Sequence, residues 1–350
     1  MCSNGYMALS SDETIKREII DHIGYAPYGY EARIFFEGSN DDQKLFQDGG
    51  LTFDFDNQSY GSCDCVYVKK VENKEIPILA IEGTDALNRG SSGNAQGQRI
   101  HHAYGAVLNG IIGVYYLKKG KHKIQEDLYG ITYKMSKILK TPYLVTDNLD
   151  VIKNVLKYMS SDTNKMNEYI QDYLDLCYEK FTKKFNDVYE GSWDVFGKNR
   201  STVINEGENY VIKYSARMYR DFTDSSRRGG HVALGELYLS KYYFIEKKIV
   251  YLWPRMRLSE FNKLVKVKAK DKEWNKIITD KQTVIATIDD LINLPNNLKD
   301  NLMNLRDIDN LNRNPGRNLK ENAFTELHTL LHSKEVTLSE RVMKGIKSTN

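Results

Sequence analysis

Two acidic residues mark neighbouring β-rich segments in the first third of the chain. Asp64 lies at the start of CDCVYV, and Glu82 ends IPILAIE. The polar stretch VENKE between these segments predicts a β-hairpin that brings Asp64 back beside Glu82. Because residues two apart on a strand face the same way, Glu82 and Thr84 would project together. Two converging carboxylates offer the hard oxygen ligands that Mg²⁺ prefers, and a metal held there could support phosphodiester hydrolysis.

Taken singly, Asp64 would more often be a turn residue and Glu82 a solvent-exposed strand end. The sequence after Glu82 favours a metal site over this alternative. A loop rich in Gly and Ser at 90–94 leads into AQGQRIHHAYGAVLNG. Apolar residues recur in that segment at helical spacing, so we expect a helix that includes Gln96. The apolar segment IIGVYYL follows and predicts a strand.

This order of hairpin, helix and strand resembles the PD-(D/E)XK nuclease family, and within it the type II restriction endonucleases. The resemblance covers residues 51–118, with Asp64 matching the first acid of the motif and Glu82 the second. It implies a restriction-endonuclease-like core, Mg²⁺ as the cofactor and double-stranded DNA as the substrate. Asp64 and Glu82 would hold the metal ion.

The chain departs from the family pattern where the motif has Lys, because Thr84 stands at that position, and Cys63 replaces a frequent Pro. Another group must then orient the attacking water. The candidates lie at the start of the expected helix, where backbone N–H groups and Arg can hold a phosphate: Gln96, Gln98 and Arg99. The family often uses a third acidic ligand, for which four residues stay open: Glu31, Glu37, Asp54 and Asp56.

Basic residues form local clusters although Lys and Arg exceed Asp and Glu by only 50 − 47 = 3. Clusters on a nearly neutral chain indicate phosphate contacts on one face. Arg227 and Arg228 precede two Gly and form the preferred base-reading loop, since Arg pairs bidentately with guanine. The DNA-binding candidates are Lys119, Lys121, Arg227, Arg228, Arg255 and Arg257.

Two histidine pairs could suggest a metal site. His101 and His102 are adjacent, so on a helix they point about 100° apart and cannot chelate one ion together. We expect one of them to pack and the other to contact solvent. His328 and His332 have i, i+4 spacing but fit an amphipathic helix. Neither CxxC nor HExxH is present, so the sequence gives little support for zinc.

The predicted fold class is α/β, with a mixed central sheet, flanking helices and a largely helical C-terminal region. Residues 1–160 would form the nuclease core with an N-terminal helix. Residues 161–260 would form a mixed α/β region for DNA recognition or dimerisation, and residues 261–350 the helical C-terminal region. At 350 residues the chain is long enough for about two domain-sized units.

The composition is that of a globular protein, with 41% hydrophobic and 28% charged residues. Four cysteines cannot supply a disulfide framework, and no apolar run approaches the length of a membrane span, so we expect a cytoplasmic protein. Cutting both strands of a symmetric site favours a homodimer. The sequence thus predicts a type II restriction enzyme; a non-catalytic DNA-binding or regulatory protein and a repair or structure-specific nuclease are the alternatives.

Overall fold

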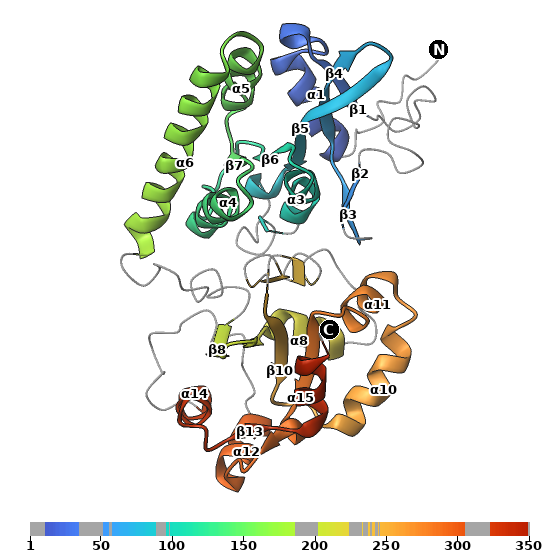
Figure 1. Cartoon of the computed structure of the whole chain (residues 1–350), viewed down its shortest axis with the longest axis vertical. Coiled ribbons are helices and arrows are strands. Elements are labelled where there is room, and N and C mark those ends of the chain that lie inside the picture. Colours follow the sequence, from blue (N-terminus) through green and yellow to red (C-terminus); the bar gives the residue numbers. More distant parts are fainter. Residues whose placement is uncertain are drawn as a thin grey trace, which may run out of the picture. The chain divides into compact units, whose positions relative to one another are not determined.

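The computed structural model describes most of the chain, namely residues 11–34, 52–55, 58–88, 96–97, 99–185, 202–223, 247–304 and 323–348, with single positions between 233 and 246. The chain divides into two compact units, Met1–Asn186 and Asp187–Asn350. Figure 1 shows the elements of both units. We call them unit 1 and unit 2 and describe each by itself.

Unit 1 is built on a mixed five-stranded sheet with the order β1-β4-β5-β6-β7. Its strands are β1 (Glu31–Ile34), β4 (Cys65–Val71), β5 (Lys74–Thr84), β6 (Ile112–Leu117) and β7 (Tyr143–Thr146). The first three pair antiparallel, whereas β5, β6 and β7 pair parallel. Every residue of β6 and β7 is buried, as expected where helices cover both faces of parallel strands. The α/β class with a mixed sheet between helices is therefore confirmed.

The hairpin predicted between the two acidic segments is confirmed as β4–β5. Cys65 pairs with Ile81 at its base, and Val71 pairs with Lys74 at its tip. The first four residues of β4 are buried and the last three are exposed, so the base lies in the core and the tip extends into solvent. Glu72 makes the tight turn at the tip with a φ of 55°. Asp64 and Glu82 belong to the buried base.

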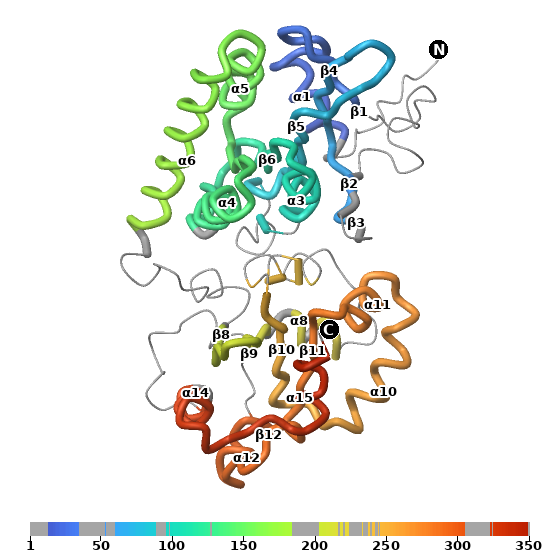
Figure 2. Tube along the Cα trace, in the orientation of Figure 1, coloured from blue at the N-terminus to red at the C-terminus, as the bar shows by residue number. Residues whose placement is uncertain are grey.

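Helices cover both faces of this sheet (Figure 2). They are α1 (Ser11–Ile23), α3 (Ile100–Leu108), α4 (Glu126–Leu139), α5 (Leu149–Ser161) and α6 (Thr163–Phe185), with short 3₁₀ turns η1 (Pro27–Gly29) and η2 (Ala86–Asn88). A side chain on Gly83 would collide with Ile15 of α1, and one on Gly113 would collide with Val107 of α3. Gly113 pairs with Ala80, so these two residues face the same side of the sheet. Ala80 and Gly83 are three residues apart on β5 and face opposite sides, so α1 and α3 lie on opposite faces of the sheet.

Helix α6 packs against α4 and α5, and its residues Ile170 and Leu174 join the core of unit 1. Helix α6 therefore belongs to unit 1, which ends at Asn186. An amphipathic pattern over residues 162–185 predicts this helix, but it does not predict the surface that the helix covers.

A second, separate hairpin lies on α3. It consists of β2 (Thr52–Phe55) and β3 (Gln58–Ser62), which pair antiparallel. Gly105 of α3 allows this close approach, because a Cβ there would lie 2.7 Å from the carbonyl oxygen of Phe53 and 2.9 Å from Cβ of Tyr60. The hairpin therefore covers the side of α3 that faces away from the five-stranded sheet.

Unit 2 contains a four-stranded sheet with the order β11-β10-β9-β8. Its strands are β8 (Thr202–Glu206), β9 (Tyr210–Tyr214), β10 (Lys248–Trp253) and β11 (Thr283–Thr287); β12 (Leu291–Ile292) pairs with β13 (Thr337–Leu338). The helices are α8 (Ala216–Thr223), α10 (Leu258–Lys268), α11 (Lys272–Ile278), α12 (Asn296–Asn304), α14 (Ala323–Ser333) and α15 (Glu340–Lys347), with the 3₁₀ turn η3 (Ile288–Asp290). Aliphatic residues from α12, α14 and α15 fill one core, whereas Phe222, Trp253, Phe261 and Trp274 stack in another.

The described residues after 260 are mostly helical, as predicted, but they also contain short strands. Strand β11 lies in that region and pairs parallel with β10, so a boundary at residue 260 would cut the sheet. The segment TVIAT is rich in β-branched residues and its last three residues are buried, a signal hidden by the Lys-, Asn- and Leu-rich sequence around it. Among the described helices, none is both long enough and apolar enough to cross a membrane.

Candidate active site

The base of the β4–β5 hairpin brings the two predicted acids together. The backbone N–H of Asp64 donates to the carbonyl oxygen of Ile81 at 2.9 Å, which extends the strand pairing one residue past β4. Asp64 therefore lies beside Glu82. Its Oδ2 accepts a hydrogen bond from the backbone N–H of Gly83 at 2.8 Å. Asp64 is 7% exposed and Glu82 is 1% exposed, so both carboxyl groups lie in the protein interior.

This burial changes the electrostatics of the pair. Desolvation and, to a smaller extent, the charge of Glu82 together raise the pKa of Asp64 to about 8, against the opposing hydrogen bond from Gly83. Burial and the same two acids also raise the pKa of the Cys63 thiol. In the protein without a bound cation, Asp64 thus carries a proton near neutral pH. A divalent cation would relieve this repulsion.

Thr84 ends β5 on the same face as Glu82. It is 9% exposed, and its carbonyl oxygen accepts from the backbone N–H of Lys118 at 2.9 Å. Its hydroxyl carries no charge, so Thr84 cannot supply the cation that Lys supplies at this position of the motif. A positive group near Glu82 must come from another element.

That element is α3. Arg99 is the residue at its N-cap, and Nη1 of Arg99 lies 3.7 Å from Oε1 of Glu82. His102 follows three residues later, and its Nδ1 lies 3.2 Å from the same oxygen. The sequence analysis proposed Arg99 but did not propose His102. The spacing of three gave a usable signal, because residues i and i+3 share a helix face.

The expectation that one of the adjacent histidines contacts solvent is wrong. His101 is 2% exposed and His102 is 7% exposed. The reason is the β2–β3 hairpin, which covers the outer side of α3. The packing of this hairpin on α3 was not predicted from the sequence.

Gln96 does not belong to the helix, which begins at Ile100. It lies in a turn and is completely buried. Its Nε2–H donates to the carbonyl oxygen of Lys123 at 3.0 Å, and its Oε1 accepts from the backbone N–H of Gln125 at 2.9 Å. The amide therefore holds the segment before α4 in place. Gln98 lies outside the described residues.

The basic turn between β6 and α4 lies close to the end of β5. Besides the contact of Lys118 with Thr84, the backbone N–H of His122 donates to the carbonyl oxygen of Leu87 at 3.0 Å. Lys119 and Lys121 of this turn are exposed. Two of the predicted DNA-binding residues therefore lie near the end of the strands at which the acidic pair lies.

The other predicted DNA contacts belong to unit 2. Arg227 and Arg228 lie outside the described residues. Arg255 is partly buried, and Arg257 is exposed at the N-cap of α10, where its Nη1 lies 2.9 Å from Oδ1 of Asp289. His328 and His332 stack on α14, as expected for residues one turn apart.

Of the four candidates for a third acidic ligand, Glu31 is the one whose side chain the structure describes, and it pairs with basic residues. Glu31 pairs with Val68, three residues from Cys65, and its Oε2 lies 2.8 Å from Nζ of Lys70 and 3.1 Å from Arg33. Glu37, Asp56 and the side chain of Asp54 lie outside the described part of the chain. Within the described part, no group of three or more His, Cys, Asp or Glu residues could hold a metal ion. Two carboxylates still fit Mg²⁺, which binds through one or two carboxylates, water and substrate phosphate.

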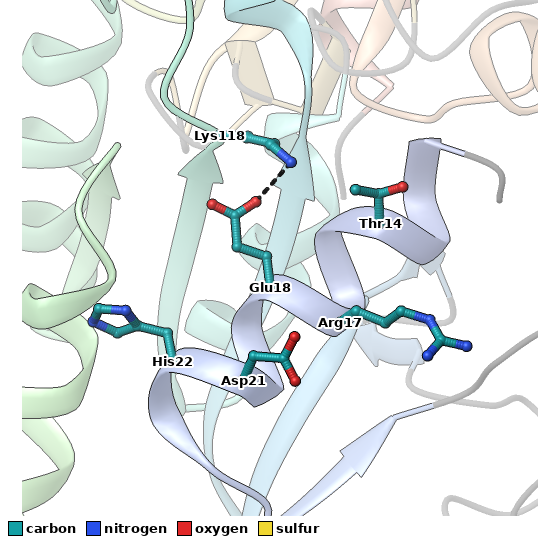
Figure 3. A pocket seen from close by; sticks show the side chains of 6 residues that line it. All are labelled: Thr14, Arg17, Glu18, Asp21, His22 and Lys118. Atoms are coloured by element: carbon teal, nitrogen blue, oxygen red, sulfur yellow. Dashed lines mark ion pairs between the residues drawn. The ribbon is translucent and has the colours of Figure 1, made fainter. Parts of the chain in front are cut away.

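A pocket of about 440 Å³ lies along α1 (Figure 3). Both signs of charge line it, and Nζ of Lys118 lies 3.0 Å from Oε2 of Glu18. His22 also contacts Asp150 at 2.8 Å. Because these charges are neutralised within the protein, the pocket is a weaker candidate for phosphate chemistry than the acidic pair. Its lining residues are Thr14, Arg17, Glu18, Asp21, His22 and Lys118.

Comparisons with known proteins give no match, whether with family models, with curated proteins or with solved structures. Function is therefore inferred from two features of unit 1. One is the buried acidic pair, and the other is the cationic surroundings that α3 and the turn after β6 provide.

Proposed function

We propose that the chain is a Mg²⁺-dependent endonuclease that hydrolyses phosphodiester bonds of double-stranded DNA. The proposal rests on the buried pair of Asp64 and Glu82 at the base of an antiparallel hairpin. The hairpin is followed by α3 and then by β6, parallel to β5, which is the order of elements in the PD-(D/E)XK family that the sequence resembles. Unit 1 would then be a restriction-endonuclease-like core.

Asp64 and Glu82 would hold the metal ion through their carboxylate oxygens. When bound, Mg²⁺ would lower the pKa of a water molecule and stabilise the charge that develops on the phosphate. The donor set fits this ion, because both groups supply oxygen, and a cation between them would offset the repulsion from Glu82 that contributes to the raised pKa of Asp64. Metal binding would require Asp64 to release its proton.

Arg99 is the residue that we propose to contact the scissile phosphate. It is partly exposed and lies near Glu82, so it can reach both the buried acid and a ligand in solvent. This places on α3 the cation that Thr84 does not provide. Lys119 and Lys121 would bind neighbouring phosphates from the turn after β6.

Cleavage at a defined sequence would make this a type II restriction enzyme. A two-fold symmetric homodimer would supply one active site for each strand of a symmetric target. Base recognition is proposed for Arg227 and Arg228, with Arg255 and Arg257 as further DNA contacts. These roles follow from the sequence clusters and remain predictions.

The substitution at position 84 favours a second candidate function. Without the motif Lys, the protein could bind DNA as a catalytically silent regulator. A third alternative keeps the nuclease core but uses it for repair or structure-specific cleavage. The three candidates differ in the DNA products that they give with Mg²⁺.

The deciding experiment incubates the protein with unmethylated plasmid and phage DNA, with and without Mg²⁺, and separates the products on a gel. We expect discrete Mg²⁺-dependent fragments that are lost in Glu82→Ala, while a mobility-shift assay shows that DNA binding persists. Glu75→Ala is the matched control, since Glu75 lies on the same strand near the hairpin tip and pairs with Arg33.

Full cleavage by Glu82→Ala would contradict the assignment of the site. Binding without cleavage by the wild-type protein would favour the silent DNA-binding protein. Cutting confined to ends, flaps or mismatches would favour the repair nuclease over the restriction enzyme.

A further inference from the structure

The contact between His102 and Glu82 joins two buried side chains from different elements. The side chain of His102 is 9% exposed and that of Glu82 is 1% exposed, with 3.2 Å between Nδ1 and Oε1. The two atoms lie at ion-pair distance but do not meet hydrogen-bond geometry. Because an ionised carboxylate only accepts hydrogen bonds, Nδ1 can serve as its partner only as an N–H donor. His102 therefore acts on the same oxygen as Arg99 but from a position that is much less accessible to solvent.

The imidazole is held from two further directions. Gly61 of β3 adopts a φ of 102°, and a Cβ at this position would lie 2.5 Å from Cδ2 of His102. The β3 backbone therefore packs directly on the ring. His101 packs against it edge-on, with 4.5 Å between ring centroids. These contacts restrict the orientation of the imidazole, and with it the direction of the Nδ1–H bond.

We propose that His102 is a positioning residue that fixes the orientation of the Glu82 carboxylate for metal binding. The inference deepens the proposed function and rests on it for the role of Glu82 as a metal ligand. A buried acid at the end of a strand needs such a partner, because a carboxylate that is free to rotate binds a metal ion less tightly. Partners of this kind typically contribute about 10- to 100-fold to metal affinity or activity.

The test measures Mn²⁺ binding directly, by electron paramagnetic resonance of the free ion, in the full-length protein without DNA. We expect His102→Leu to weaken Mn²⁺ binding by about tenfold or more. His102→Asn should stay within about threefold of the wild type, since the Asn amide can place a donor near the position of Nδ1. Val107→Ala is the control, because it truncates a buried side chain of α3 that packs towards Gly113 of β6.

His102→Gln guards against the case in which His102→Leu fails to fold, as judged by circular dichroism. Gln is polar and fills much of the same space, but it places its donor nearer the position of Nε2. We therefore expect Gln, unlike Asn, to weaken Mn²⁺ binding. In cleavage assays the defect should lie in kcat rather than KM for DNA, because the buried imidazole is not positioned to bind DNA.

Several results would overturn the inference. Folded His102→Leu or His102→Gln with wild-type Mn²⁺ affinity would do so while leaving the nuclease proposal intact. An equal loss in Val107→Ala would show a packing effect instead. A wild-type protein that binds Mn²⁺ but cuts no DNA would overturn the proposed function alone, and absence of Mn²⁺ binding by the wild type would overturn both.

Discussion

The two units bury their acidic groups in opposite ways. In unit 2, Asp290 accepts hydrogen bonds from Arg341, Ser339 and the backbone of Thr287. Burial alone would raise the pKa of Asp290, but these donors lower it overall. In unit 1, Asp64 lies beside a second carboxylate and its pKa rises to about 8. The partners of Asp290 favour its charged form, whereas the surroundings of Asp64 disfavour it.

This difference is the one expected between an acid with a structural role and the acid that we propose to be functional. A buried charge whose partners satisfy it helps to hold its elements together, and here Asp290 joins η3 to α15. A buried charge without sufficient compensation costs stability, and strongly perturbed carboxylates of this kind concentrate in functional sites. The comparison therefore predicts opposite responses when either acid is neutralised.

The largest effect is expected for Asp64→Asn on activity. Asn keeps the shape of the side chain and can still accept from the N–H of Gly83, but it loses the charge that we propose to bind the metal ion. We expect plasmid cleavage to fall by about 10³-fold, while the urea midpoint of the metal-free protein rises at alkaline pH. An active variant, or one that is less stable than the wild type at that pH, would remove the contrast between the units.

The next effect concerns stability in unit 2. Asp290→Ala leaves the Arg341 guanidinium and the hydroxyl groups of Thr287 and Ser339 without this acceptor, so we expect a loss of about 3 kcal/mol in the free energy of unfolding. Asp289→Ala is the neighbouring control. Asp289 contacts Arg257 at a more exposed position and accepts from the backbone of Leu258, so its loss should cost about 1 kcal/mol. Equal losses in urea denaturation would show that burial does not distinguish the two acids.

The pH dependence of stability gives a third test of the comparison. The folded protein binds the Asp64 proton up to about pH 8, whereas the unfolded chain releases it near the ordinary pKa of 3.8. Folding therefore takes up a proton between these values, and this contribution to stability is lost as pH rises through them. The slope for one group is at most about 1.4 kcal/mol per pH unit.

The measurement is a series of urea titrations in EDTA from acid to alkaline pH, with wild type and Asp64→Asn in parallel. We expect the wild type to lose stability relative to the variant as pH rises. Parallel curves would place the Asp64 pKa near its ordinary value. That result would make Asp64 resemble the satisfied acids of unit 2.

The acidic pair could be predicted from the sequence because local rules determine it. Alternation along two strands and a short polar turn were enough to place Asp64 beside Glu82 at the hairpin base. Arg99 was also identified, since it precedes the helix that follows the motif. These features depend on residues close together in the sequence.

His102 and strand β11 required information that local patterns do not contain. His102 is buried because β2–β3 packs on α3, a contact that depends on Gly61 and Gly105 rather than on any histidine motif. Strand β11 becomes evident only from its pairing with β10, in which Thr283 pairs with Ile249. Local sequence patterns do not contain such a distant pairing. Gln96 was assigned to a helix because its spacing fitted, although its amide binds backbone groups near α4.

The smallest expected effect concerns substrate binding and compares the two ends of the β4–β5 hairpin. Lys119 and Lys121 are exposed near the acidic base, whereas Lys69 and Lys74 are exposed near the tip. If DNA lies along the end of the sheet that carries Asp64 and Glu82, Lys119 and Lys121 should contact phosphates. Replacing both by Ala should then reduce the slope of log K against the logarithm of the salt concentration by about 2, since each phosphate contact contributes about 0.9.

The Lys69→Ala/Lys74→Ala variant removes the same charge from the opposite end and should leave that slope unchanged. Fluorescence anisotropy with labelled duplex DNA at several salt concentrations measures both variants in the same way. The double variants separate local from general electrostatics, because each lowers the net charge of the chain by the same amount. Equal slopes would mean that net charge alone drives binding, and a larger loss at the tip would place the DNA away from the acidic pair.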